Sequence, residues 1–166
     1  MEPIKGAASC TLGPLTVAPA SPPGTYFGVA ENMLRGVQVL AAAPPPPTLA
    51  LALVAAHVLE CLLKASILRG GPDAALEKEL EHGKDHHDLT ALWGKAFAQG
   101  PKSPPGWVEH LSRLHNRPYP LRYSKAKDGA TRPAGYFHGI GSPAPEPMTS
   151  ELAALLETVR GQLRRA

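Results

Sequence analysis

The sequence predicts an all-α protein, a four- to five-helix up-and-down bundle with a long Pro/Gly-rich loop before its last helix. Apolar residues recur at intervals of three and four in several segments, and no stretch alternates as a half-buried strand would. The 19 prolines and 16 glycines gather between these segments rather than within them. With 166 residues, 43% of them hydrophobic, the chain is long enough for one domain with a buried core.

The first predicted helix follows an N-terminal arm. Residues 1–25 carry several prolines and no sustained periodicity, so we expect a flexible arm there and the bundle in residues 26–166. From Phe27 onward one face is apolar, and the helix ends before a run of four prolines. Glu31 can pair with Arg35 one turn later.

The second predicted helix is the most apolar. Thr48 caps it, it runs to about Arg69, and two glycines follow as a stop signal. Leucine, valine and alanine cover nearly its whole circumference, which is typical of the central helix of a bundle. The charged segment Asp73–His82 that follows has only two leucines to bury, so we interpret it as a surface turn of helix or an insertion.

Two further helices are predicted between the charged segment and residue 118. The third is capped by Asp85 or Asp88 and ends at Gly100. The fourth starts at Ser103, with a proline in its first turn, where proline is tolerated. Its apolar face ends at His115, and Pro118 terminates it. The face consists of Trp107, Val108, Leu111, Leu114 and His115.

The last predicted helix follows the long loop at residues 118–147. It opens at Thr149 or Ser150 and buries five apolar residues. Three arginines near its end suit the negative pole of the helix dipole. The buried positions are Leu152, Leu155, Leu156, Val159 and Leu163, and the arginines are Arg160, Arg164 and Arg165.

Composition excludes several classes of protein. The net charge of +3 permits a nucleic-acid partner without demanding one. The longest apolar run is shorter than the roughly 18 residues of a membrane span, and no secretory signal is evident, so we expect a soluble, cytoplasmic protein with no membrane partner. Two cysteines make no disulfide scaffold. The motifs of nucleotide hydrolases and esterases are absent, and no cofactor is predicted. The histidines and carboxylates lack the spacing of metal ligands within one segment, so no metal is predicted.

A polar stripe interrupts the apolar second helix. His57, Glu60, Cys61 and Lys64 project within a narrow arc, because steps of three and four residues return to the same side. One interpretation is a solvent-facing Glu60–Lys64 pair. The other is a polar cluster at a cleft or a subunit interface.

The segment from Lys84 to Leu89 contains two adjacent histidines, His86 and His87, followed by Asp88. An aspartate at a helix start is explained by capping. The same backbone amides, together with histidine and lysine, could instead hold a phosphate.

The segment Leu114–Tyr123, which includes the end of the fourth helix, places two arginines, two tyrosines and a histidine on a backbone stiffened by two prolines. Arg117, Arg122 and Tyr123 could present planar groups to a phosphate or a base. Alternatively, Arg122 reaches back to a carboxylate such as Glu60 while Tyr123 packs over the bundle.

Three pieces of the sequence together resemble the HEPN superfamily (higher eukaryotes and prokaryotes nucleotide-binding). They are Ala-x-His-Val-Leu-Glu-x-Leu-Leu-Lys-Ala ending at Ala65, His-Asp-Leu-x-x-Leu at residues 87–92, and Arg-Tyr at residues 122–123 before the last helix. The resemblance covers residues 27–165. The resemblance implies a helical bundle that commonly dimerises. Many members of the family are metal-independent ribonucleases, often toxins or defence proteins. Others have lost catalysis and bind nucleotides, RNA or a protein partner.

The chain departs from the catalytic pattern of that family, an Arg, a spacer of four to six residues and a His near the last helix. Only Arg132 and His138 have this spacing, and Pro133 and Gly135 between them prevent the helical turn that the family uses. We therefore predict a noncatalytic HEPN-like homodimer that binds RNA, a nucleotide or a protein partner, in a defence or toxin–antitoxin setting. The alternatives are a ribonuclease using Arg132/His138 or His87/Arg122, and a structural or assembly protein.

In the noncatalytic interpretation, Glu60, Lys64, His87 and Arg122 hold the bundle and loop together or line an anion pocket. In the ribonuclease interpretation, His87 is the general acid or base, and Arg122 stabilises the charge that develops on phosphate.

Overall fold

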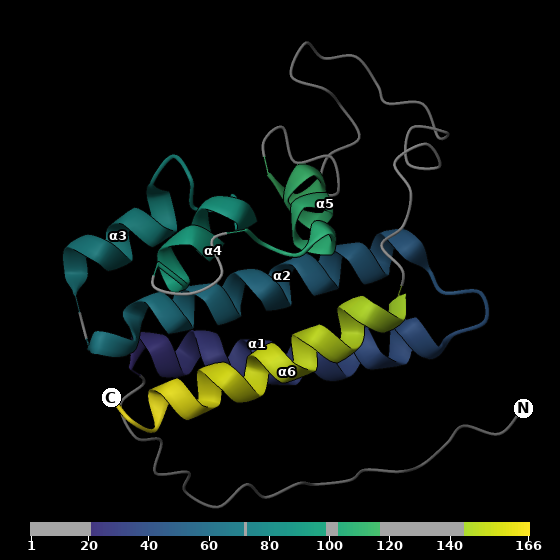
Figure 1. Cartoon of the computed structure of the whole chain (residues 1–166), viewed down its shortest axis with the longest axis horizontal. Helices are drawn as coiled ribbons and strands as arrows, with labels where there is room; N and C mark the ends of the chain where they lie inside the picture. The colour runs from purple at the N-terminus through teal and green to yellow at the C-terminus, as the bar shows by residue number, and fades with distance from the viewer. Residues whose placement is uncertain (1–20, 72, 99–102, 117–144) are drawn as a thin grey trace, which may run out of the picture.

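The computed structural model describes residues 21–71, 73–98, 103–116 and 145–166. Within these ranges the chain forms six α-helices and a short 3-10 turn, with no strand, so the predicted all-α class is confirmed. The elements, in chain order, are α1 (Pro22–Ala42), α2 (Thr48–Ile67), η1 (Leu68–Gly70), α3 (Ala74–His82), α4 (Leu89–Ala96), α5 (Gly106–His115) and α6 (Pro145–Leu163), as Figure 1 shows.

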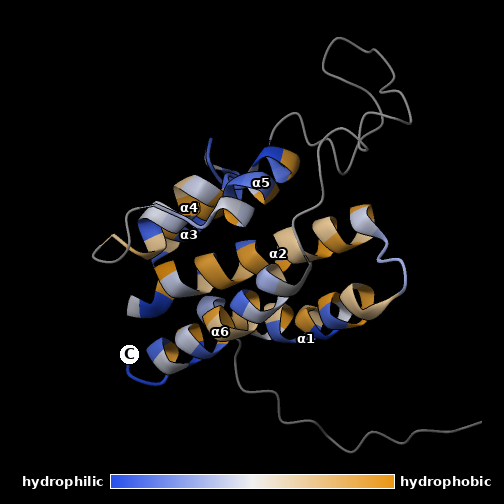
Figure 2. Cartoon of the chain, turned by 45° about the vertical axis from the view of Figure 1, so that its right-hand side comes forward, coloured by the Kyte–Doolittle hydropathy of each residue, from blue (hydrophilic) through white to orange (hydrophobic). Residues whose placement is uncertain are grey.

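Helix α2 lies in the middle of the bundle. Helices α1 and α6 run along one side of it, and α3, α4 and α5 cover the other side (Figure 1). Direct contacts join α2 to α1, α4, α5 and α6. Most of its residues are apolar, as the colouring in Figure 2 shows, and most of them are buried. The predicted central position of this helix is therefore confirmed.

The core is built around leucines of α2. Leu59, Leu62 and Leu63 are fully buried, and each such side chain stabilises the fold by about 1.5–3 kcal/mol relative to an exposed one. The stretch Thr48–Gly70 is long and apolar enough to cross a membrane. However, 78% of its most apolar window is buried inside the bundle, and the core helix of a soluble protein passes the same test, so the stretch is weak evidence for a membrane.

Helix α1 begins at Pro22, five residues before the predicted start at Phe27. Two prolines occupy its first turn, where the backbone N–H that proline lacks would have no partner within the helix. The Ser21 hydroxyl caps the helix by accepting a hydrogen bond from the Gly24 amide at 3.3 Å. The predicted arm is therefore helical from residue 22, and its residues 1–20 lie outside the described part of the chain.

The charged segment after η1 is a true helix. Asp73 caps α3 by accepting hydrogen bonds from the first amides, and Leu80 is buried beneath it. Of the two predicted caps for the next helix, Asp88 is the one used. That helix, α4, ends at Ala96, before the predicted stop at Gly100.

Prolines also move the starts of α5 and α6. Helix α5 begins at Gly106 and not at Ser103, because residues 103 and 104 each precede a proline, which disfavours the helical conformation. Helix α6 begins at Pro145, several residues before Thr149, with prolines in its first turn. There they remove only amides that have no acceptor within the helix.

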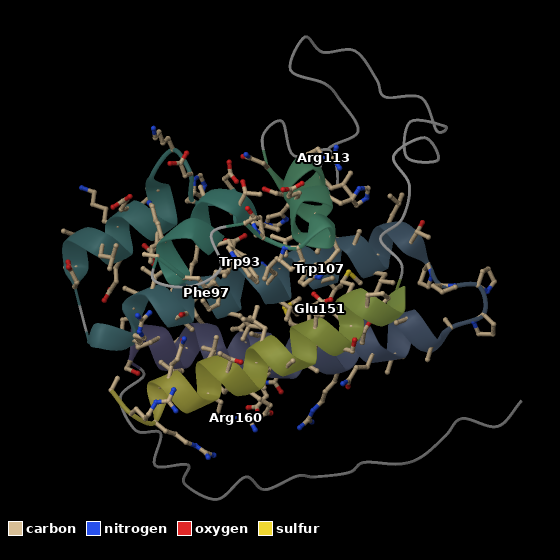
Figure 3. All side chains as sticks on the ribbon, viewed as in Figure 1. Trp93, Phe97, Trp107, Arg113, Glu151 and Arg160 are labelled. Carbon is tan, nitrogen blue, oxygen red and sulfur yellow. The ribbon has the colours of Figure 1, made fainter. Side chains whose placement is uncertain are left out.

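Side-chain contacts fasten α6 to the helices on both sides of the bundle. Arg160 binds Glu31 of α1 at 2.6 Å, so the carboxylate expected to pair with Arg35 reaches α6 instead. The Trp107 indole N–H donates to Glu151 at 2.5 Å and joins α5 to α6 (Figure 3). Contacts between residues so far apart in sequence could not be read from local spacing.

Candidate functional site

A buried ion pair lies at the middle of α2. The Lys64 ammonium is 2.6 Å from Glu60 Oε1, and each side chain is only 5% exposed. The interpretation of these residues as a solvent-facing pair is therefore wrong. The reason is that α2 is covered on both of its sides and has little solvent-facing surface to offer.

Two histidines from other elements reach the same carboxylate. Glu60 Oε2 lies 3.0 Å from His87 Nδ1 and 2.5 Å from His115 Nε2. The two imidazole rings meet edge to face, with their centroids 5.5 Å apart. We call Glu60, Lys64, His87 and His115 the Glu60 cluster. The His115 side chain is fully buried, whereas that of His87 is 18% exposed, so the cluster reaches the surface at His87.

Asp88 holds the two histidines in place. It directly follows His87, and its Oδ1 caps α4 by accepting two backbone amides. The same carboxylate accepts hydrogen bonds from the Ser112 hydroxyl and the Asn116 side-chain amide, both at 3.1 Å. Asn116 directly follows His115, so one carboxylate joins the segment that carries His87 to the end of α5 that carries His115.

The electrostatics of the cluster favour an ionised Glu60. Burial alone would raise the pKa of its carboxyl group, but hydrogen bonds from His115, Lys64 and His87 and the charge of Lys64 together hold this pKa well below its usual range. Burial and the adjacent Glu60 charge raise the pKa of the Cys61 thiol to about 12. The thiol therefore stays protonated and is no nucleophile near neutral pH.

Tyr26 and His57 flank the cluster. The Lys64 ammonium lies 5.6 Å from the centroid of the Tyr26 ring, and burial raises the pKa of the Tyr26 hydroxyl. His57 shares the stripe predicted on α2, but its Nε2 contacts Cys61 Sγ at 3.8 Å. The structure thus brings Glu60, Lys64 and His87 together and sets His57 beside them.

Several predicted site residues lie outside the described part of the chain. They come from the segment between α5 and α6, and the convergence of His87 with an arginine stays a prediction for that reason. These residues are Arg117, Arg122, Tyr123, Arg132 and His138.

The sequence reasoning missed His115 as a site residue. It placed His115 on the apolar face of the fourth helix, and the side chain is indeed buried there. The available signal was a polar side chain ending an otherwise apolar face, which requires a buried hydrogen-bond partner. Glu60 is that partner, 55 residues away in sequence.

Three side chains of the cluster could hold a metal ion. The donor atoms of Glu60, His87 and His115 all lie within 4.8 Å of one another. They come from α2, from the turn before α4 and from α5, whereas the predicted absence of a metal rested on ligand spacing within one segment. That prediction therefore did not address this set.

The fold and the site together define a helical bundle with a charged cluster buried against its central helix. No family model, no curated protein and no solved structure matches the chain. The resemblance to the HEPN superfamily stays a prediction carried by the sequence motifs.

Proposed function

We propose that the chain is a cytoplasmic, noncatalytic HEPN-like module that binds a phosphate-bearing ligand, RNA or a nucleotide, as a homodimer. The observation that carries the proposal is the Glu60 cluster. The first two motif pieces that resemble the family are separate in sequence. Lys64 from the first piece and His87 from the second both contact the carboxylate of Glu60. A shared polar centre is the expected result if the pieces act as one unit.

Side chains, rather than backbone amides, would recognise the phosphate. The Asp88 carboxylate already accepts the first amides of α4, which occupies the groups that a phosphate at this helix start would use. His87 is the surface-reaching member of the Glu60 cluster. Lys84, between α3 and α4, and Arg113 of α5 are both exposed. Arg113 projects from α5 on the side away from α2 (Figure 3). These groups suit an anion of modest charge.

The chemistry around the cluster supports binding rather than covalent catalysis. The Cys61 thiol stays protonated, since its pKa is raised to about 12. The Ser112 hydroxyl donates to Asp88, which gives it a structural role. Lys64 is bonded to the Glu60 carboxylate, so its ammonium is part of the fold as well.

A metal-independent endoribonuclease, toxin-like in its setting, is the second candidate. The specific observation in its favour is the 3.0 Å contact between Glu60 and His87 Nδ1. A buried carboxylate that orients an imidazole is the arrangement of a general acid or base. Arg122 would then stabilise the charge on phosphate, and Arg132 with His138 is the other pair that the sequence offers.

Exposed apolar side chains on α1 and α2 support association with a second chain. Val29, Val39 and Leu49 are 38%, 72% and 45% exposed. They are consistent with the homodimer in the proposal, and equally with the third candidate, an assembly protein that binds a different partner.

Binding to fluorescent RNA and to labelled ATP, followed by fluorescence anisotropy, tests the proposal. We expect saturable binding by the wild type with at least one of the two probes, about 10-fold weaker binding by His87→Ala, corresponding to about 1.4 kcal/mol, and no change for His82→Ala, an exposed histidine at the end of α3. Equal binding by all three proteins would refute a site at His87.

The same samples, run on a gel, separate the candidate functions. Intact RNA after incubation with the wild type supports the noncatalytic module. RNA cleavage that disappears in His87→Ala or in His138→Ala would establish the ribonuclease instead. No binding to either probe would leave the assembly protein, whose partner is then sought through its oligomeric state.

A further inference from the structure

We propose that Glu60, His87 and His115 form a binding site for a divalent transition-metal ion such as Zn²⁺. Two imidazole nitrogens and one carboxylate oxygen lie within 4.8 Å of one another, and both nitrogens converge on Glu60 Oε2. This inference goes beyond the phosphate-binding function and does not rest on it.

The distances fit the first shell of an ion. Zinc binds imidazole nitrogen and carboxylate oxygen at about 2.0–2.2 Å, so two ligands of one ion lie roughly 3–3.5 Å apart. Glu60 Oε2 is 3.0 Å from His87 Nδ1, and its 2.5 Å separation from His115 Nε2 must open by less than about 1 Å. On binding, each imidazole presents its lone pair to the ion and carries its proton on the other nitrogen.

The donor set selects the class of ion. Mg²⁺ and Ca²⁺ require several oxygen ligands, and only one carboxylate is available here. Two imidazoles with one carboxylate suit Zn²⁺, Co²⁺, Ni²⁺ or Fe²⁺, and three protein ligands leave a coordination position open, as in catalytic zinc sites. That position would face solvent at His87, the one partly exposed ligand.

The surroundings hold the ligands in position. Asp88 and Asn116, which follow the two histidines in sequence, are hydrogen-bonded to each other at 3.1 Å, and this link keeps the imidazoles together. Lys64 occupies the second oxygen of Glu60 at 2.6 Å, so the carboxylate would bind the ion through Oε2 alone. Partners of this kind, which fix a ligand without touching the ion, are typical of metal sites.

Lys64 also limits the affinity. Its positive charge lies on the same carboxylate as the proposed ion and offsets the negative charge of Glu60. The affinity must then come from the two imidazole nitrogens. Replacing either histidine should therefore remove most of the binding.

Isothermal titration of the untagged, EDTA-treated full chain with ZnCl₂, in buffer without phosphate, tests the site. We expect one equivalent to bind the wild type. His87→Gln and His115→Gln each keep an amide N–H as a donor to Glu60, and each should bind at least about 100-fold more weakly, since the loss of even an outer-shell partner costs about 10- to 100-fold. His82→Gln, at an exposed histidine, should bind as the wild type does.

Two outcomes would overturn the proposal: no binding of one equivalent by the folded wild type, or equal affinity of His87→Gln and His82→Gln. Circular dichroism confirms that each variant is folded. His87→Gln remains informative if His115→Gln does not fold, because the His87 side chain is partly exposed. RNA and ATP are absent from the titration, so its failure leaves the proposed phosphate binding untouched.

Discussion

Replacing Glu60 with alanine should destabilise the protein by about 3–5 kcal/mol. Lys64 and His115 would stay buried and His87 partly buried, and all three would lose their common acceptor. Removing one partner of a buried ion pair costs about this much, because an uncompensated charge is left in the core. For a chain of this length, that is a fall in melting temperature of about 6–20 °C. Urea unfolding followed by circular dichroism in the presence of EDTA measures it.

The Glu79–Lys95 pair is a matched control. Its oxygen-to-nitrogen distance is also 2.6 Å, but its side chains are 55% and 37% exposed. Exposed pairs contribute about 0–1 kcal/mol, so Glu79→Ala should change stability by at most that amount. Equal losses for Glu60→Ala and Glu79→Ala would refute the argument that burial, and not distance, decides the value of the pair.

Further outcomes follow from the buried cysteine, the helix cap at Asp88 and the core. In a Cys10→Ser background, Cys61 should resist iodoacetamide at pH 8 and react fully in denaturant, since burial raises the pKa of its thiol to about 12; fast labelling of the native chain would contradict this. Asp88→Ala should cost about 2 kcal/mol in urea unfolding, the upper end for a helix cap, because the tie to α5 is lost as well. Hydrogen bonds outweigh burial and lower the pKa of Asp88, so its contribution is present above pH 3.8 and shrinks as the pH falls below that value. Leu62→Ala, at a fully buried core position, should cost about 2–5 kcal/mol by calorimetry, whereas a loss under 1 kcal/mol would mean that the core can close around the gap.

Periodicity predicted the helices well because the helices around α2 each bury one apolar face. The central place of α2 followed from leucine, valine and alanine around its whole circumference. The helix starts were predicted less well, and prolines account for this. Pro22 and Pro145 lie within first turns, where a missing amide costs little, although proline otherwise indicates a loop.

The Glu60 cluster could be predicted only in part. A Glu60–Lys64 pair at this spacing has the same local pattern whether it is exposed or buried, and only the helices packed around it decide which. One clue was available: a helix that is apolar on nearly every side has no solvent-facing surface for a charged pair. The meeting with His115 depends on the packing of α5 across α2, which local spacing does not encode.

The covering of α2 from both sides has a consequence during synthesis. Helices α1 and α2 are adjacent in the chain and can pair early, because contacts that are local in sequence form fast. Helix α6 completes the same side, yet its Arg160 meets Glu31 only after 129 further residues. Until α6 emerges from the ribosome, the apolar surface that it will cover stays open to water. Exposed apolar surface of this kind favours aggregation of a nascent chain.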